Sequence, residues 1–190
     1  FFFKIFPNNT WSTFFEEPDP NIGLIGNEII NIQKNNNEKI WICTTNGISV
    51  LEYNSLPGGI TNENWEYYNT TNSFIPSNMA KSILFEESGK IWIGTTSGLA
   101  IIENDTWNVQ TFETEGIYSN NIKKIIQNPS DQKIYIGTLN GGLYTWENNE
   151  FYYWNNTNSG LIDNSINDFI FDQNNNLIIT SPSAGLEVQT

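Results

Sequence analysis

The stretch Ile91-Trp92-Ile93-Gly94-Thr95 recurs along this chain of 190 residues. It is repeated as Ile40-Trp41-Ile42-Cys43-Thr44 and Ile134-Tyr135-Ile136-Gly137-Thr138, and more loosely as Leu177-Ile178-Ile179-Thr180-Ser181. The copies follow one another at steps of 51, 43 and 43 residues. Self-similarity at a period of this length indicates a repeat architecture, in which each unit buries its apolar surface against its neighbours.

Three further kinds of residue keep the same phase. An asparagine lies 13 or 14 residues before each copy, at Asn27, Asn78, Asn120 and Asn164. A glycine follows each copy within a few residues, at Gly47, Gly98, Gly142 and Gly185. An aromatic residue lies 13 residues before three of the asparagines, at Trp65, Trp107 and Phe151. Independent markers that stay in register indicate a true structural repeat.

Each repeat is predicted to contain four short strands. The first follows the asparagine, at 29–32, 80–85, 122–126 and 166–171. The second is the repeated stretch itself, and the third follows the glycine, at 48–51, 99–102, 143–146 and 186–188. The fourth carries the aromatic residue, at 65–68, 107–112 and 151–154. These runs are rich in β-branched and aromatic residues, and turn-forming clusters separate them.

The second strand indicates how the sheets are arranged. Ile40, Trp41 and Ile42 are all apolar, whereas a half-exposed antiparallel strand would alternate between apolar and polar residues. Four-stranded sheets packed radially around an axis enclose such a strand on both faces. The predicted fold is therefore an all-β β-propeller over residues 1–190, with a partial blade at 1–26 and repeats starting near 27, 78, 120 and 164.

The repeats resemble those of the two-component regulator propeller family. That repeat reads approximately Asn-Ser-Gly-Leu-Pro-x-Asn-x-Ile, followed by a polar turn, Ile-Trp-Ile-Gly-Thr and Gly-Leu. This chain is similar at Asn72-Ser73-Phe74-Ile75-Pro76-Ser77-Asn78 and at Asn158-Ser159-Gly160-Leu161-Ile162-Asp163-Asn164. It matches residue for residue at Ile91-Trp92-Ile93-Gly94-Thr95 and Gly98-Leu99.

The resemblance covers nearly the whole chain, and its motif is specific to the fold and not to a ligand. It implies a seven-bladed propeller of the kind found in extracytoplasmic sensor regions of hybrid two-component systems and in cell-surface and secretion-linked proteins. A periplasmic, extracellular or cell-surface location and a sensing or assembly role are implied with it.

Four repeats leave two arrangements open. Phe3-Lys4-Ile5-Phe6 and the residues after Gly185 both lie in the phase of a third strand. A closed ring of four blades would use Trp11 to Phe14 to complete the last blade, but one third strand would be left over. The favoured prediction is part of a larger ring. Open blade faces would be apolar, so the expected partners are the remaining propeller blades or another protein chain.

Composition argues against several kinds of partner. The net charge is −13 with only eight Lys and Arg residues, which disfavours nucleic acid and an anionic membrane surface because both require basic patches. No segment approaches the roughly 20 apolar residues of a membrane span, so membrane insertion is not predicted. The chain has no histidine, which excludes Ser-His-Asp triads and His-ligated metals. Neither a cofactor nor enzyme activity is predicted.

A carbohydrate-active enzyme is the catalytic alternative, and it would require a pair of carboxylates. Asp168 and Glu28 fall on or beside first strands, but no acid recurs in a pattern that suggests a pair. Asp172-x-Asn174-x-Asn176 is similar to the start of a calcium loop, yet the glycine and bidentate glutamate of such loops are missing. An ordinary turn without a metal is predicted there. Cys43 takes the place of Gly94 and Gly137, so we expect a small buried residue.

The repeated residues have both a structural and a functional interpretation. Trp41, Trp92 and Tyr135 could form an aromatic platform for a ligand, but an all-apolar strand favours packing between blades. The repeated asparagines could line a polar channel, but each is expected to cap a turn by bonding its own backbone. The repeated glycines are predicted at turns that require positive φ or close approach.

The sequence favours a non-catalytic binding, sensor or scaffold module whose ligand or protein partner contacts the loop face. The predicted loop at 55–64 is the most distinctive, because it accounts for the long 51-residue step. Asn64, Trp65 and Tyr67 border it and are the candidate binding residues, since loops on a rigid scaffold are free to carry function. A glycan or small molecule is an alternative ligand. A structural subunit of a surface or secretion-linked assembly is an alternative role.

Overall fold

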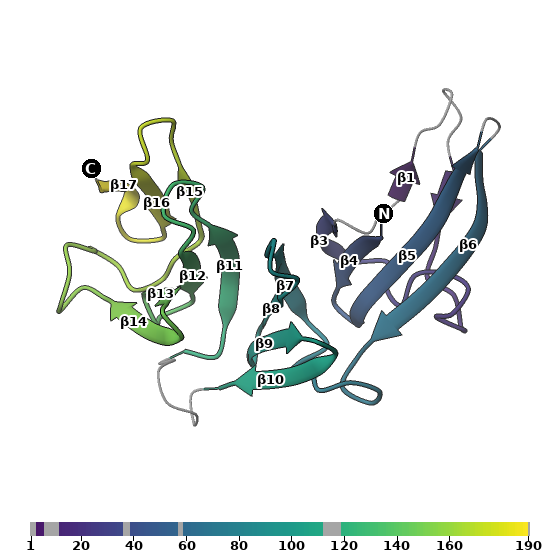
Figure 1. The fold of residues 1–190 in the computed structure, drawn as a ribbon. Helices are drawn as coiled ribbons and strands as arrows, with labels where there is room; N and C mark the ends of the chain where they lie inside the picture. Colours follow the sequence, from purple (N-terminus) through teal and green to yellow (C-terminus); the bar gives the residue numbers. More distant parts are fainter. Residues whose placement is uncertain (1–2, 6–11, 36–38, 57–58, 112–118, 190) are drawn as a thin grey trace.

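The computed structural model describes residues 3–5, 12–35, 39–56, 59–111 and 119–189. Within these ranges the chain forms seventeen strands in five sheets and no helix (Figure 1). The strands of each sheet pair in antiparallel fashion with their neighbours in sequence, as expected for propeller blades. The predicted all-β propeller fold is confirmed.

Three sheets have four strands each. Blade 1 contains β3 (Ile29–Lys34), β4 (Ile40–Thr44), β5 (Gly47–Leu56) and β6 (Gly59–Tyr68). Blade 2 contains β7 (Ala80–Phe85), β8 (Ile91–Thr95), β9 (Gly98–Glu103) and β10 (Thr106–Gln110). Blade 3 contains β11 (Ile122–Gln127), β12 (Ile134–Thr138), β13 (Leu143–Glu147) and β14 (Glu150–Trp154).

Two smaller sheets lie at the ends of the described chain. β1 (Phe3–Ile5) pairs with β2 (Ser12–Phe14), as the third and fourth strands of a blade do. Blade 4 contains β15 (Asp168–Phe171), β16 (Leu177–Ser181) and β17 (Gly185–Gln189). β2 is therefore hydrogen-bonded to β1 and not to β17, so it does not complete blade 4.

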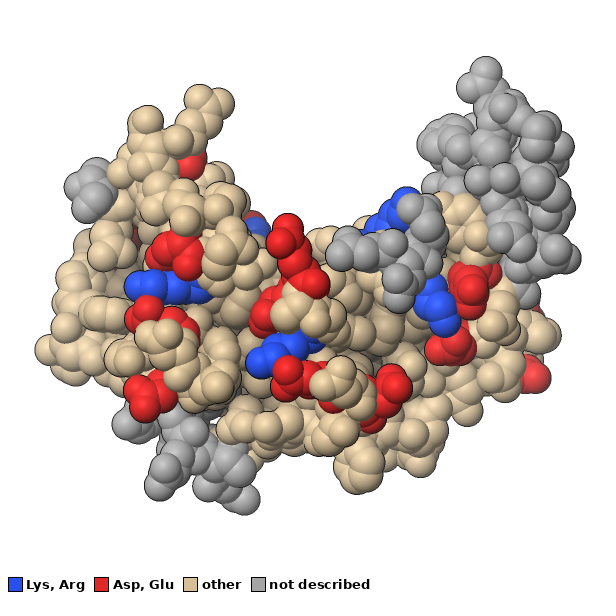
Figure 2. All heavy atoms as spheres, in the orientation of Figure 1, with Lys and Arg blue, Asp and Glu red and all other residues tan. Residues whose placement is uncertain are grey.

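The blades form an open arc. The first strands β3, β7, β11 and β15 contact one another in this order along the inner side of the arc (Figure 1). The N-terminal sheet and blade 4 lie at opposite ends, and the space-filling view shows a wide notch between them (Figure 2). The alternative of a closed four-blade ring is wrong, because β2 is paired at the far end of the arc from β17.

Most strands lie where the sequence predicts them, with one exception. The predicted loop at 55–64 is instead largely the end of a long hairpin, since β5 continues to Leu56 and β6 begins at Gly59. Register pairs continue from Glu52 with Asn64 to Leu56 with Gly59. The extra residues of blade 1 therefore lengthen two strands, because local pairing satisfies their backbone groups better than a loop would.

The second strands are enclosed as expected, with all five residues of β4 buried and four of the five in β8. Apolar clusters join each blade to the next. The repeated aromatic residue lies in each of these clusters and faces the following blade: Trp41 contacts Phe85 at 5.6 Å between ring centroids, Trp92 packs with Ile125, and Tyr135 contacts Phe171 at 4.9 Å. Blade-to-blade packing is thus the role of these aromatic residues.

A small residue in each second strand admits the following blade. A Cβ added at Gly94 would lie 2.4 Å from Ile122 Cγ2, and one at Gly137 would lie 2.8 Å from Ile166 Cγ2. Blade 1 has the larger Cys43 at this position, and the residue corresponding to Ile122 is Ala80. Both are fully buried in one cluster. A larger residue on one blade is therefore matched by a smaller one on the next.

The repeated glycines after the second strands are turn residues, as predicted. Gly47 and Gly98 have φ values of 139° and 138°, and Gly142 and Gly185 have 80° and 73°. Only glycine adopts such φ values at little cost.

Each complete blade also carries an ion pair that the repeat comparison overlooked. A lysine just before the second strand forms an ion pair with a glutamate of the third: Lys39 with Glu52 (3.2 Å), Lys90 with Glu103 (3.5 Å) and Lys133 with Glu147 (3.0 Å). Figure 2 shows lysines bordered by acidic residues along this face. Partly exposed pairs of this kind contribute about 0–1 kcal/mol each, so they mark the repeat more than they stabilise it.

Gly94→Ala is expected to lower the free energy of unfolding by about 1–3 kcal/mol, because the added methyl group overpacks the contact with Ile122. Ile122→Ala alone is expected to cost about 2–5 kcal/mol. The double variant is expected to lose less than the sum of the two, because its methyl group enters the vacated space, as Cys43 does beside Ala80. Urea unfolding of the three variants measures the coupling.

Gly160→Ala is the matched control, since a Cβ there meets no atom within 4 Å. It is expected to change stability by no more than about 0.5 kcal/mol. Strict additivity of Gly94→Ala and Ile122→Ala would contradict the proposed match between neighbouring blades.

Candidate functional site

The three residues predicted beside the 55–64 segment do not form one surface. Trp65 is only 4% exposed and packs edge-to-face on Phe14 of β2, with ring centroids 5.3 Å apart. Its ring is a core element that joins blade 1 to the preceding sheet and is not available to a partner. Asn64 is exposed and Tyr67 is half-buried, on opposite faces of β6 because side chains alternate along a strand. A binding role for these two residues stays a prediction.

The repeated asparagines hold the connections between blades. Asn78 Oδ1 accepts a hydrogen bond from the Thr70 N–H, and Asn164 Oδ1 accepts one from the Asn156 N–H, both at 2.8 Å. Asn27 Oδ1 accepts one from the Glu16 N–H, also at 2.8 Å. The partners lie eight or eleven residues earlier in the chain, and not in the adjacent turn as expected. These side chains therefore fix how the chain enters each blade.

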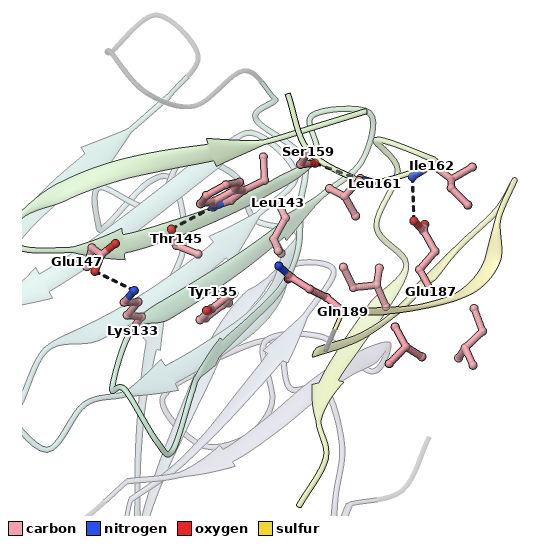
Figure 3. A pocket seen from close by; sticks show the side chains of 15 residues that line it. Lys133, Tyr135, Leu143, Thr145, Glu147, Ser159, Leu161, Ile162, Glu187 and Gln189 are labelled. Atoms are coloured by element: carbon pink, nitrogen blue, oxygen red, sulfur yellow. Dashed lines mark hydrogen bonds and ion pairs between the residues drawn. The ribbon is translucent and has the colours of Figure 1, made fainter. Parts of the chain in front are cut away.

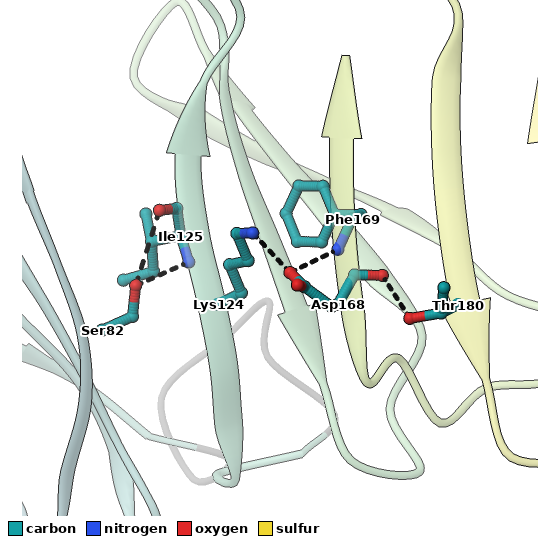
Figure 4. A network of polar contacts seen from close by, with 6 residues as sticks. All are labelled: Ser82, Lys124, Ile125, Asp168, Phe169 and Thr180. Atoms are coloured by element: carbon teal, nitrogen blue, oxygen red, sulfur yellow. Dashed lines mark hydrogen bonds and ion pairs between the residues drawn. The ribbon is translucent and has the colours of Figure 1, made fainter. Parts of the chain in front are cut away.

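Polar contacts also join the first strands on the inner side of the arc (Figure 4). The Ile125 N–H donates to Ser82 Oγ at 3.0 Å, which links β7 to β11. Lys124 forms an ion pair with Asp168, which links β11 to β15. Thr180 Oγ1 donates to the Asp168 carbonyl at 3.1 Å. Asp168, one of the acids on an inner strand, is thus engaged in holding two blades together.

Asp172 and Cys43, the candidate metal ligand and thiol, also have structural roles. Asp172 Oδ1 accepts from the N–H groups of Asn174 and Asn176, both at 2.8 Å, and hydrogen bonds from Asn176 lower the pKa of this carboxyl. The described ranges contain no group of three His, Cys, Asp or Glu residues arranged to hold a metal ion. Burial raises the pKa of the Cys43 thiol to about 12, so the reactive thiolate is scarce at neutral pH.

A groove of about 470 Å³ lies between blades 3 and 4, and we call it the end groove (Figure 3). Blade 3 lines it with Lys133, Tyr135, Leu143, Thr145, Glu147 and Trp154. The connection at 159–162 closes one end, and Ile179 with residues 186–189 of blade 4 forms the opposite wall. This volume is within the range of sites that hold a side chain or small ligand.

Polar groups are placed around an apolar floor in the end groove. The Trp154 Nε1–H donates to Thr145 Oγ1 at 3.3 Å, and Glu187 Oε2 accepts from the Ile162 N–H at 2.8 Å. The hydrogen bond to Glu147 raises the pKa of Lys133, which keeps its ammonium charged. Burial raises the pKa of Tyr135, whose hydroxyl stays neutral. The arrangement can recognise an apolar group with a polar edge.

The end groove was not predicted, although the sequence contains a signal for it. Ala100 and Ile102 of blade 2 face the preceding blade, and blade 3 has Tyr144 and Trp146 at the equivalent register positions. Blade 4 has Glu187 and Gln189 there. A comparison of the third strands would have shown that this interface lacks apolar residues to fill it.

No family model matches the sequence, and no curated protein matches it. Among solved structures, the chain is similar to the extracellular domain of a hybrid two-component system from B. thetaiotaomicron, with a TM-score of 0.71 and 23% identity over 84% of this chain. It is also similar to PorZ, a surface component of the type-IX secretion system of Porphyromonas gingivalis, with a TM-score of 0.67 and 15% identity over 93% of this chain. The chain spans 21% and 27% of the length of these two proteins.

A streptogramin B lyase is similar as well, with a TM-score of 0.56 and 14% identity over 92% of this chain and 56% of the lyase. The described ranges contain no helix long and apolar enough to cross a bilayer. Identities this low establish the fold alone: the chain is an arc of β-propeller blades. Since a sensor domain, a secretion component and a lyase share these blades, the fold does not choose between functions.

Asp163 connects the segment before β15 to the turn between β16 and β17, and its contribution to stability depends on pH. Its Oδ1 accepts from the Ser165 N–H at 2.8 Å, and its Oδ2 accepts from the Ser183 N–H at 3.0 Å. These hydrogen bonds, with that of Ser165 the strongest cause, lower the pKa of Asp163. The carboxylate therefore stabilises the fold above its ordinary pKa of about 3.9, and this contribution is lost as the pH falls through the lower folded-state pKa.

Asp163→Asn is expected to lower the midpoint of urea unfolding at pH 7, and the difference from the wild type is expected to shrink at acid pH, as the wild-type carboxylate becomes protonated. Asp105→Asn in the exposed β9–β10 turn is the control and is expected to show no such narrowing. A difference for Asp163→Asn that is equal at both pH values would contradict the assignment.

Proposed function

We propose that this chain is a non-catalytic propeller module whose blade 4 packs through its outer face against a further blade or another protein chain, in a protein that acts outside the cytoplasm. The observation that carries the proposal is a row of exposed apolar side chains on that face. We call it the end face; its residues Ile170, Leu186 and Val188 are exposed, and Ile178, which completes the row, is half-buried.

In the part of the chain that the structure describes, no blade covers the end face. Ile178 pairs with Ile170 on one side and with Val188 on the other, so the three side chains lie in one row across the sheet. Ile178 holds the register position of Trp41 and Trp92, both of which are buried by the following blade. In contrast, Ile170, Leu186 and Val188 are 51%, 65% and 54% exposed. A contiguous apolar surface of this kind marks an interaction site.

Two considerations support a binding role outside the cytoplasm. The sensor domain and PorZ are extracellular and surface proteins, and both have the same fold. Four acids in or beside blade 4 stabilise the fold through hydrogen bonds or an ion pair: Asp163, Asp168, Asp172 and Glu187. A carbohydrate-active enzyme would need two carboxylates facing a shared substrate, and no such pair is seen among these four. A structural role in a surface assembly would use the same end face.

Val188→Cys is expected to be protected from a membrane-impermeant maleimide on intact cells that carry the whole protein. In the isolated 190-residue chain, where the end face is exposed, it is expected to react at least about tenfold faster. Ile22→Cys, which replaces a side chain that is 64% exposed in the connection between β2 and β3, is expected to react readily in both settings. The native thiol gives little background, because Cys43 is fully buried.

Labelling rates followed by mass spectrometry decide between the outcomes. Equal labelling of Val188→Cys and Ile22→Cys on intact cells would contradict a partner on the end face. Failure of both to react on intact cells, with reaction after lysis, would contradict a location outside the cytoplasm.

A further inference from the structure

Lysines are distributed unevenly over this acidic chain, which has 21 acids, 8 lysines and no arginine or histidine. Half of the lysines lie on the first strands β3, β7 and β11, which contain no acid: Lys34, Lys81, Lys123 and Lys124. These strands line the inner side of the arc (Figure 1). The inner wall of blades 1 to 3 is therefore basic, although the net charge of the chain is −13.

Two of the inner lysines have no counter-ion. The lysines beside the second strands are each neutralised by a glutamate: Lys39, Lys90 and Lys133. On the inner wall, Lys124 forms an ion pair with Asp168 of β15 (Figure 4). Lys81 and Lys123 are half-buried, and the ammonium group of neither forms an ion pair or hydrogen bond with any residue in the described ranges.

A β-bulge in each first strand positions these two lysines. In the pairing of the first strand with the second, the register skips Ile30 in β3, Lys81 in β7 and Lys123 in β11. A bulged residue is left out of the hydrogen-bonded ladder, and its side chain is turned from the direction that a regular strand would give it. Because the bulges lie at equivalent positions, they bring Lys81 and Lys123 to the same level of the inner wall.

Both lysines line a hollow of about 330 Å³ on the inner side of the arc, which we call the inner hollow. Its volume is at the small end of the range for ligand sites. Lys124 and Asp168 also line it, so three lysines and one aspartate leave two positive charges there. Asn31 and Asn167 add neutral polar groups. The lining residues come from the first strands of blades 1 to 4 and the residue before β15, and none belongs to the end groove or the end face.

We infer that the inner hollow binds a small dicarboxylate. The Ile125 N–H donates to Ser82 Oγ at 3.0 Å, which holds β7 and β11 together beside both unpaired lysines, so their ammonium groups can reach one small ligand. Each ammonium is a compact charge with three N–H donors for carboxylate oxygens. Two separate carboxylates allow the like-charged ammonium groups to stay apart, whereas a single compact anion would draw them together. The inference goes beyond the proposed function and does not depend on it.

Isothermal titration calorimetry of the 190-residue chain with succinate, at low ionic strength, tests the inference. Saturable binding is expected, and it is expected to weaken as salt is added, because the charges are partly screened. Butyrate has the same carbon chain but a single carboxylate, so it is expected to bind at least about tenfold more weakly. No binding of succinate, equal affinity for butyrate, or tighter binding of inorganic phosphate would overturn the dicarboxylate site.

Lys81→Met and Lys123→Met each remove one ammonium group and keep an unbranched side chain. Each is expected to weaken succinate binding by at least about tenfold. Lys90→Met is the matched control, because it removes the same charge from the ion pair with Glu103, outside the inner hollow. It is expected to leave the affinity within about twofold.

Equal losses of affinity in the three variants would reveal a general effect of charge and would overturn the inner hollow as the site. Urea unfolding of each variant verifies that it is folded. The comparison of succinate with butyrate uses the unaltered chain, so it decides the inference even where a variant folds poorly.

Discussion

The packing of each second strand against the following blade is the constraint on which this structure depends. A buried strand with apolar residues on both faces requires a neighbouring sheet on each side. Gly94 and Gly137 each leave room for an isoleucine of the following blade. The larger Cys43 lies instead in the same cluster as Ala80, the smaller residue at the isoleucine position. Protein interiors are packed as densely as crystals of small molecules. A larger side chain on one blade therefore requires a smaller one at the contacting position of the next blade. This packing between successive blades explains why the same residue types recur in each repeat.

The same constraint explains why the proposed interaction surface lies at the end of the arc. The interfaces between blades 1 and 2 and between blades 2 and 3 are filled by aromatic and branched side chains from both sheets. At blade 4 the pattern stops: Gln189 and Glu187 replace apolar residues on the inner wall, and the outer face exposes Leu186 and Val188. The proposed interaction surface therefore lies where no further blade covers the described part of the chain.

Residue identity alone did not reveal which aromatic residues were available for binding. Trp65 borders a long insertion, which favours a binding role on sequence grounds, yet its ring packs on Phe14 in the core. Trp154 carries the same chemistry at the end of a fourth strand but is half-exposed. The difference lies in whether a neighbouring sheet covers the residue, and the local sequence does not specify that. The segment 55–64 lacks a strong apolar pattern, so its sequence predicts a loop. In the structure it extends the two paired strands β5 and β6.

The sequence by itself determined the repeat, the four strands of a blade, the buried second strand and the glycine turns, because these follow from local periodicity and backbone preference. Only the tertiary structure decided that the blades form an open arc, that the repeated asparagines bind partners in the preceding connection, and that a groove lies between blades 3 and 4. These features depend on the register between sheets and on which faces find a neighbour. Such information arises from contacts between residues distant in the chain, so no local pattern encodes it.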